Sequence, residues 1–170
     1  DQWPEFDLRL TEEQAGEGYV RRTYTFAVEY RDQRSVPGAA NVRDAQVDRL
    51  SIDLYLPQPL PAGDRRAAVL ALHPTGALGK RIVAGEGPSP NRQYAVELAQ
   101  RGYVVLAPDY PSFGDARDYD FSADGYVSGT MKGIVNHRAG VDVLASLSFA
   151  DPSRIGVIGH SLGGHNALFL

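Results

Sequence analysis

The stretch Arg154-Ile155-Gly156-Val157-Ile158-Gly159-His160-Ser161-Leu162-Gly163 decides the fold. Residues 154–158 have the apolar pattern of a short buried strand, and residues 164–170 have the pattern of a helix. A Gly-x-Ser-x-Gly turn between a strand and a helix is typical of a nucleophile elbow, where close backbone packing holds the serine in an unusual conformation. We therefore predict that Ser161 is a nucleophile. The alternative is an ordinary glycine-rich turn from strand to helix.

Two segments nearer the N-terminus alternate between apolar and polar residues. They cover residues 19–30 and 50–56, and this period of two predicts a pair of antiparallel strands with one solvated face. The polar residues between them, 31–44, contain Pro37-Gly38 and predict a hairpin-like connection.

The chain divides into a lead-in and one domain. Residues 1–18 are acidic, so we predict an irregular surface segment with Trp3 and Phe6 packed against the body. Residues 19–170 suit part of a single domain, since the 170-residue chain is 43% apolar. Residues 162–170 end as an apolar helix without a cap, so we expect the chain to be the N-terminal portion of a longer protein.

The hydrophobic pattern changes after the turn-rich residues 57–64. Two continuously apolar segments, 67–72 and 103–107, predict strands that are covered on both faces. A helix after Pro90 and a second helix over 128–148 are predicted to follow them, with Asp151-Pro152 as a break before the last strand. The second helix is predicted to bury one stripe, formed by Met131, Ile134, Val141 and Leu144.

This alternation of buried strands and helices predicts the α/β fold class. The sheet is expected to be mostly parallel with an antiparallel N-terminal edge.

The composition limits the possible partners and the compartment. A net charge of −4 and a pI near 5.5 argue against binding to nucleic acid or to an anionic membrane. No apolar run approaches the ~20 residues that span a bilayer. The chain contains no Cys, which excludes disulfides and a cysteine nucleophile. A polar start without Met favours a processed, exported protein, either periplasmic or secreted.

Acyl transfer at a serine requires donors for the oxyanion, and two backbone N–H groups are candidates. One is the N–H of Leu162, directly after the nucleophile. The second is expected from the loop His73-Pro74-Thr75-Gly76, which follows a predicted strand. Because Pro74 has no N–H, Thr75 is the first choice and Gly76 the second. The alternative is that this loop is only a tight turn.

None of the four histidines is expected to be the general base. His160 points away from the nucleophile on the turn, and His165 lies on the helix that follows it. His137 is predicted to face solvent or to bond across helices. His73 belongs to the loop that is expected to form the oxyanion hole.

The loop over 108–125 supplies possible contacts to a substrate. Tyr110 and Phe113, together with His73, could form a substrate wall. Asp109 is predicted to fix the loop by hydrogen bonds. Lys80 is predicted to be solvated or to hold its loop in place.

The sequence points to no metal and no cofactor. His160 and His165 are off the i,i+4 spacing of a helical zinc pair, and there is no H-E-x-x-H motif. The glycines near Ser161 do not form G-x-G-x-x-G, and residues 76–80 lack the full Walker spacing.

Three blocks resemble the α/β-hydrolase superfamily: 73–76, 101–110 and 151–164. They are most similar to its dienelactone-hydrolase, acetyl-xylan-esterase and acylaminoacyl-peptidase-like branches. The resemblance implies a mostly parallel sheet of roughly eight strands, of which this chain supplies the first five. It also implies that Ser161 is the nucleophile and that the N–H groups of Leu162 and Thr75 form the oxyanion hole.

Two departures from that family shape the expected function. Dienelactone hydrolases use cysteine at the position of Ser161, which favours an esterase here. The family order places the acid and the histidine after the nucleophile, but only nine residues follow Ser161. The triad acid and base are therefore expected in a missing C-terminal segment of the same fold, and the chain alone is expected to be inactive.

The expected function is a serine carboxylic-ester hydrolase that acts on a small-molecule ester through an acyl-enzyme. Two alternatives remain open at this point. One is a serine peptidase of the acylaminoacyl-peptidase kind, and the other is a hydrolase-fold protein that binds a ligand without catalysis.

Overall fold

The computed structural model describes residues 6–31 and 46–170. One sheet of six strands runs through these residues in the order β1-β2-β3-β5-β4-β6. The strands are β1 (Arg9–Gly16), β2 (Tyr19–Arg31), β3 (Gln46–Pro57), β4 (Arg66–Leu72), β5 (Val104–Pro108) and β6 (Ala150–Gly159). The helices are α1 (Tyr94–Gln100), α2 (Gly129–Ser146) and α3 (Leu162–Ala167), with short 3-10 helices η2 (Gly79–Ala84) and η3 (Gly114–Ala116).

The sheet combines an antiparallel part with a parallel part. Strands β1, β2, β3 and β5 pair antiparallel in that order, whereas β4 pairs parallel with both β5 and β6. The predicted antiparallel edge next to a parallel α/β sheet is therefore confirmed. The predicted hairpin-like connection lies almost wholly outside the described residues.

The lead-in prediction was wrong for residues 9–16, which form a strand and not an irregular segment, although they lie at the surface as predicted. Residues Arg9–Gly16 form β1, a sixth strand that the sequence pattern did not indicate. All eight residues of β1 are exposed, so the strand has no apolar alternation that could reveal it. Phe6 does pack edge-to-face on Phe26 of the core, as predicted, while Trp3 lies outside the described residues.

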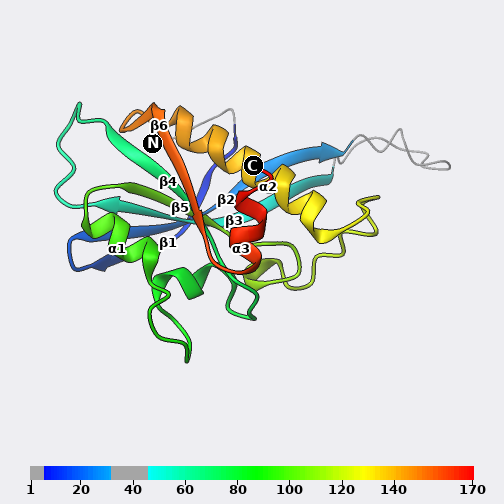
Figure 1. Ribbon diagram of the computed structural model, residues 1–170. Helices are drawn as coiled ribbons and strands as arrows, with labels where there is room; N and C mark the ends of the chain where they lie inside the picture. Colours follow the sequence, from blue (N-terminus) through cyan, green and yellow to red (C-terminus); the bar gives the residue numbers. More distant parts are fainter. Residues whose placement is uncertain (1–5, 32–45) are drawn as a thin grey trace.

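Helices cover the two faces of the sheet, and β5 shows how its sequence serves both. Val104 and Leu106 pack in the core on the α2 side, whereas Val105 and Ala107 pack on the α1 side. Figure 1 shows α1 and α2 on opposite faces of the sheet. A strand between two helical layers needs apolar residues at every position, which explains the continuous apolar pattern.

Helix α2 buries a different face from the one predicted. Met131 is 52% exposed, whereas His137, which was predicted to face solvent or to bond across helices, is 2% exposed. The packed face contains small residues because Gly133 and Gly140 bring the helix close to Tyr110 and Leu70. Of the predicted stripe only Leu144 is fully buried.

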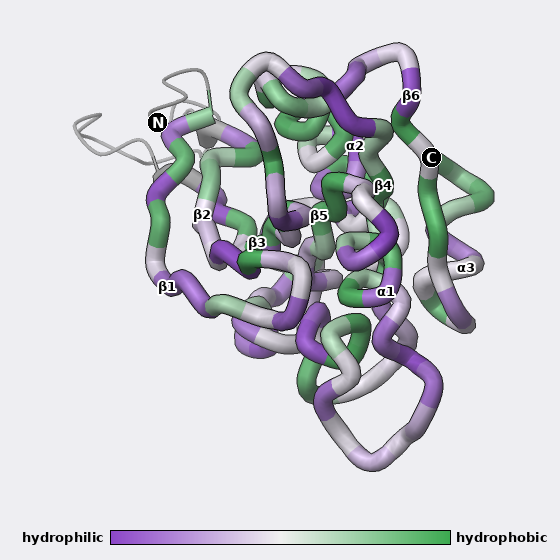
Figure 2. The backbone as a smooth tube through the Cα atoms, turned by 90° about the vertical axis from the view of Figure 1, so that its left-hand side faces the viewer, coloured by the Kyte–Doolittle hydropathy of each residue, from purple (hydrophilic) through white to green (hydrophobic). Residues whose placement is uncertain are grey.

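Strand β6 lies at an edge of the sheet, not in its interior. Among the described residues it pairs only with β4, and Val157 and Ile158 are 40% and 37% exposed. Figure 2 shows β1 and β6 at opposite sides of the molecule, with α3 beside β6. The prediction of a buried strand is therefore wrong for this chain. A break at Asp151-Pro152 was also expected, but β6 runs through both residues, with only an irregular register against β4 between Ala150 and Ile155.

Candidate functional site

The carboxyl ends of the three parallel strands meet at one edge of the sheet. Leu72 of β4 pairs with Gly159 of β6, and β5 ends at Pro108 beside them. The segments that follow these strands therefore come together. Ligand sites in open parallel sheets lie at this edge, outside the carboxyl ends of the strands. They contain His73, Asp109 and Ser161.

Ser161 occupies a tight turn between β6 and α3. Its backbone has φ 54° and ψ −117°, a left-handed conformation that costs a non-glycine residue about 1–3 kcal/mol. The side chain is exposed, and α3 begins at the next residue. The turn is closed by hydrogen bonds from the N–H of Gly163 to the carbonyl of His160 and from the N–H of His165 to that of Ser161.

Glycine is required on both sides of this serine by direct backbone contact. A Cβ on Gly159 would lie 2.3 Å from the carbonyl of Gly163. A Cβ on Gly163 would lie 2.1 Å from the carbonyl oxygen of Leu72. The predicted reason for the small residues, backbone packed against backbone, is confirmed. The second contact also holds the turn against the end of β4.

The two N–H groups that were predicted to bind the oxyanion have no hydrogen-bond acceptor in the described part of the chain. Within residues 6–31 and 46–170, neither the N–H of Thr75 nor that of Leu162 donates a hydrogen bond. The Leu162 N–H is one of the groups that an α-helix leaves unpaired at its N-terminus. Thr75 lies in an exposed position on the loop after β4. Thr75 follows β4 by three residues, and the turn that holds Leu162 packs against the carbonyl of Leu72 at the end of the same strand.

His73 links this loop to the loop after β5. Its Nδ1 lies 2.7 Å from the carbonyl oxygen of Pro74, and its Nε2 accepts a hydrogen bond of 3.0 Å from the N–H of Tyr110. Nδ1 must therefore carry the proton, since a carbonyl only accepts. Burial lowers the pKa of His73 below its usual 6.5, which keeps the ring neutral. With both nitrogens engaged, His73 has no free site for proton transfer.

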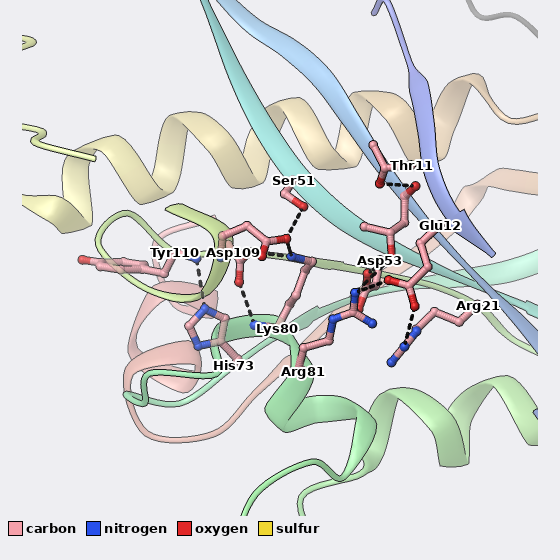
Figure 3. Close-up of polar contacts among 12 residues, drawn as sticks. Thr11, Glu12, Arg21, Ser51, Asp53, His73, Lys80, Arg81, Asp109 and Tyr110 are labelled. Carbon is pink, nitrogen blue, oxygen red and sulfur yellow. Dashed lines mark hydrogen bonds and ion pairs between the residues drawn. The ribbon is translucent and has the colours of Figure 1, made fainter. Parts of the chain in front are cut away.

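A second link is a buried ion pair between Lys80 and Asp109. The Asp109 carboxylate accepts bonds of 2.8 Å from the Lys80 N–H, 2.5 Å from Lys80 Nζ and 3.0 Å from the Asp115 N–H. Lys80 Nζ also lies 2.6 Å from the carboxylate of Asp115, which accepts a bond from Ser51. Figure 3 shows this group beside the contact between His73 and Tyr110.

The contacts of Asp109 and Lys80 agree with the loop-holding roles that the sequence predicted for them. Asp109 fixes its loop by hydrogen bonds, as predicted. Lys80 is 1% exposed, so the solvated alternative was wrong and the loop-holding alternative is confirmed. Partial burial is the largest influence on Asp115 and acts to raise its pKa, but the hydrogen bonds from Lys80 and Ser51 and the nearby positive charges together lower the pKa of that carboxyl.

Next to this pair, a further polar group joins η2 to strands β2 and β3. Asp53 is fully buried, accepts a 2.7 Å bond from Thr23 and lies 3.5 Å from Arg81. Burial raises the pKa of Asp53, although Lys80 and Arg81 oppose that change. Arg81 also bonds Glu12 of β1, so the exposed first strand is tied to the same network.

The three residues of the predicted substrate wall lie close together. Phe113 contacts both the His73 and Tyr110 rings, with centroids 6.1 and 6.0 Å apart. His73 and Tyr110 are buried, and only Phe113 is partly accessible. The Tyr110 hydroxyl is bonded to Thr130 at 3.2 Å. Their role toward a substrate stays a prediction.

A pocket of about 290 Å³ opens beside the loop after β4. Thr75 and Gly76 form one wall of it, and Ile82 lies among its apolar side chains. Its other lining residues include Leu78, Glu86, Pro88 and Arg92.

Tyr94, which the sequence did not single out, supports the same edge. Its hydroxyl donates a 2.5 Å hydrogen bond to the carbonyl of Leu72 at the end of β4. Burial raises the pKa of Tyr94 to about 12, against a lowering by a backbone bond from His160. The helix α1 is thereby attached to both β4 and the Ser161 turn.

Within the described part of the chain, none of the four histidines forms a hydrogen bond with the Ser161 hydroxyl. His160 is exposed, and His165 packs its ring on Phe169 at 4.9 Å. Burial lowers the pKa of His137 to about 3. No group of three or more potential metal ligands gathers in residues 6–31 and 46–170. In the same residues no helix has the length and apolar character to cross a membrane.

Comparison with solved structures reveals several similar folds. A candidate acetyl xylan esterase from Bacteroides fragilis has 18% identity and a TM-score of 0.68, over 95% of this chain and 43% of that one. Glucuronoyl esterase from Solibacter usitatus has 16% identity and a TM-score of 0.61, over 99% and 49%. Acetyl xylan esterase 1 from Thermoanaerobacterium has 14% identity and a TM-score of 0.60, over 96% and 47%. This chain thus spans less than half the length of each.

Comparison of sequences assigns the chain to a family. No curated protein sequence matches it significantly. The profile described as the alpha/beta hydrolase family matches residues 72–170, which include all three segments that follow the parallel strands. The resemblance of the three sequence blocks is confirmed by this match and by the shared fold. The chain belongs to the alpha/beta hydrolase family.

Proposed function

We propose that this chain carries the nucleophile and the oxyanion hole of a serine carboxylic-ester hydrolase. The observation that carries the proposal is the left-handed backbone of the exposed Ser161 between β6 and α3, fixed by two glycines that admit no side chain. A strained, accessible serine at a strand-to-helix turn is the arrangement of a nucleophile elbow. Esterases among the similar structures support the same reaction class.

In the proposed reaction, Ser161 Oγ attacks the ester carbonyl carbon and gives its proton to a base. The negative charge that develops on the carbonyl oxygen is bound by the free N–H groups of Leu162 and Thr75. The bond to the alcohol oxygen then breaks, and the alcohol leaves with the proton. Water repeats the attack on the acyl-enzyme and releases the acid and Ser161.

The proposed position of the substrate follows from the wall formed by Thr75. Thr75 lines the pocket of about 290 Å³ together with apolar residues such as Leu78 and Ile82, so we place the non-reacting part of a small ester there.

We further propose that a C-terminal segment of the same fold supplies the triad acid and histidine. No histidine of the described part bonds Ser161, and His73 has both nitrogens engaged. The exposed edge of β6, with its apolar Val157 and Ile158, is where such a segment would add the next strand.

The test uses the full-length polypeptide, meaning this chain followed by that C-terminal segment. A fluorophosphonate probe should label Ser161, and p-nitrophenyl acetate should be hydrolysed. Ser161→Ala should abolish both, while this chain alone should show no turnover. Faster turnover of aminoacyl amides than of esters would replace the esterase assignment by a peptidase. A full-length protein without label or turnover would favour a binding role.

A further inference from the structure

We propose that the buried Lys80–Asp109 pair positions the oxyanion-binding loop. The pair would act through the backbone of residues 73–80, so that the Thr75 N–H remains free and directed to the reaction. This inference rests on the proposed function, and it assigns a task to two residues that do not touch the substrate.

The loop after β5 holds the loop after β4 at several points. The N–H of Tyr110 bonds His73, and the N–H of Gly114 bonds the carbonyl of Ala77 at 3.2 Å. The Asp109 carboxylate binds both the N–H and the Nζ of Lys80. These contacts lie on both sides of Thr75, whose own N–H has no partner in the described part of the chain.

The backbone also encloses the Asp109 carboxylate. A Cβ on Gly79 and a Cβ on Gly114 would each lie 2.1 Å from Asp109 Oδ1. Both glycines have a positive φ, 53° and 56°, which leaves the backbone N–H groups and Lys80 turned toward the carboxylate. The carboxylate is thus the common partner of two turns, and its position fixes the position of both.

The charges of Lys80 and Asp109 depend on each other. Both side chains of the pair are essentially inaccessible, at 1% and 0% exposure, so neither charge is stabilised by water. Removing one partner of a buried pair leaves the other without compensation, and the surrounding backbone must rearrange to solvate it. Here the backbone that would rearrange is the loop containing Thr75. A donor displaced from the oxyanion loses much of its effect on the transition state.

The experiment compares Lys80→Met with Lys132→Met in the full-length polypeptide. Lys132 is the matched control because it is also fully buried and bound by two carboxylates, Glu29 and Asp48. We expect Lys80→Met to lower kcat for p-nitrophenyl acetate by about 10- to 100-fold and to leave KM within about threefold. The affinity for a boronic acid, which mimics the tetrahedral adduct, should fall by a similar factor. Lys132→Met should change neither quantity by more than about twofold.

A gentler variant covers the case in which Lys80→Met does not fold. Asp115→Ala removes one carboxylate of Lys80 at a residue whose side chain is 57% exposed. Like Lys80→Met, it should lower kcat and leave KM unchanged, but the fall in kcat should be only about two- to fivefold. A folded Lys80→Met or Asp115→Ala protein with unaltered kcat and boronate affinity would overturn the proposal. So would a rise in KM alone, which would indicate a role in substrate binding.

Hydrogen exchange separates this proposal from the assignment of Ser161. The peptide covering residues 73–80 should exchange at least about tenfold faster in Lys80→Met, while peptides from β2 remain unchanged. This readout needs no activity, so it stands even where Ser161→Ala retains hydrolysis and the proposed function fails. Unchanged exchange of residues 73–80 would refute the positioning role and leave the Ser161 assignment intact.

Discussion

Lys80 and Lys132 present the same local chemistry in two regions of the molecule. Each is essentially inaccessible and bound by two carboxylates, at 2.5 and 2.6 Å for Lys80 and at 2.5 Å for the contact of Lys132 with Glu29. Lys132 also binds Asp48 and has the rings of Tyr119 and Tyr126 around its Nζ, with centroids at 5.5 and 5.2 Å.

The difference lies in what each lysine connects. Lys132 joins α2 to β2 and β3, a part of the sheet that is separated from β6 by two strands. Lys80 joins the loops that follow β4 and β5, next to the Ser161 turn. The comparison teaches that a buried ion pair has no function of its own, because its effect depends on whether the backbone it fixes reaches the reacting atoms.

The largest expected effect comes from Ser161→Ala, which tests whether the reaction takes place at the turn next to the loops that Lys80 joins. Ser161→Ala should lower kcat/KM of the full-length polypeptide by at least about a thousandfold, since the proposed acyl-enzyme forms on the Ser161 hydroxyl. The melting temperature should stay the same or rise, because alanine removes only an exposed hydroxyl. Steady-state kinetics and thermal unfolding measure the two quantities. Retained activity would show that the reaction takes place elsewhere, and the two lysines would then no longer differ in their relation to the reacting atoms.

A substitution in the turn should affect both stability and activity. Gly163→Ala places a Cβ 2.1 Å from the Leu72 carbonyl oxygen, where the neighbouring atoms are backbone and cannot turn aside. We expect a loss of about 3–5 kcal/mol in the free energy of unfolding and no detectable turnover. Urea denaturation gives the first quantity. Gly156→Ala is the control, since its Cβ would meet nothing within 4 Å and should cost under about 1 kcal/mol.

The other end of the comparison should respond in stability alone. Lys132→Met removes the buried cation that binds Glu29 and the mostly buried Asp48, and we expect a loss of about 3 kcal/mol in the free energy of unfolding. At temperatures where the variant is folded, kcat and KM should match those of the unaltered protein. A fall in kcat comparable to that of Lys80→Met would erase the distinction between the two lysines.

The smallest expected effect comes from a histidine between the two regions. His137 packs its ring near that of Tyr110, with centroids 6.4 Å apart, and burial lowers its pKa from 6.5 to about 3. The unfolded chain binds a proton below pH 6.5 while the folded protein does not. Stability is therefore complete above pH 6.5 and falls as the pH drops toward about 3, by about 2 kcal/mol at pH 5.

His137→Phe removes this contribution to the pH dependence. The decrease in melting temperature from pH 7.5 to pH 5 should be smaller in the variant than in the unaltered protein. His73, whose pKa is also lowered by burial, acts in the same direction and leaves a residual decrease. An identical decrease in both proteins would show that His137 is already charged or accessible in the folded state.

The sequence predicted those parts of the fold that have a local signature. The spacing of Gly159, Ser161 and Gly163 depends on contacts within one turn, and the apolar run of β5 reflects two covered faces. The Lys80–Asp109 pair has no local signature, since its members are 29 residues apart and meet only after β4 and β5 have paired.

The wrong predictions also have physical causes. The stripe on α2 was placed by apolar residues, whereas the helix is packed through Gly133 and Gly140, which hydrophobicity does not identify as buried. β1 is exposed throughout, so no apolar alternation marks it as a strand. The burial of β6 was predicted from its apolar residues, but burial also needs a neighbour on each side.

The open edge of β6 bears on how this chain behaves in solution. In the described part of the chain β6 pairs only with β4, so its other side presents unpaired backbone N–H and C=O groups next to exposed Val157 and Ile158. Residues 155–159 contain no charged side chain that would deter another strand. Such an edge is a template for pairing with a second copy. At high concentration the isolated chain should form β-rich oligomers, and the substitution Val157→Lys should keep it monomeric.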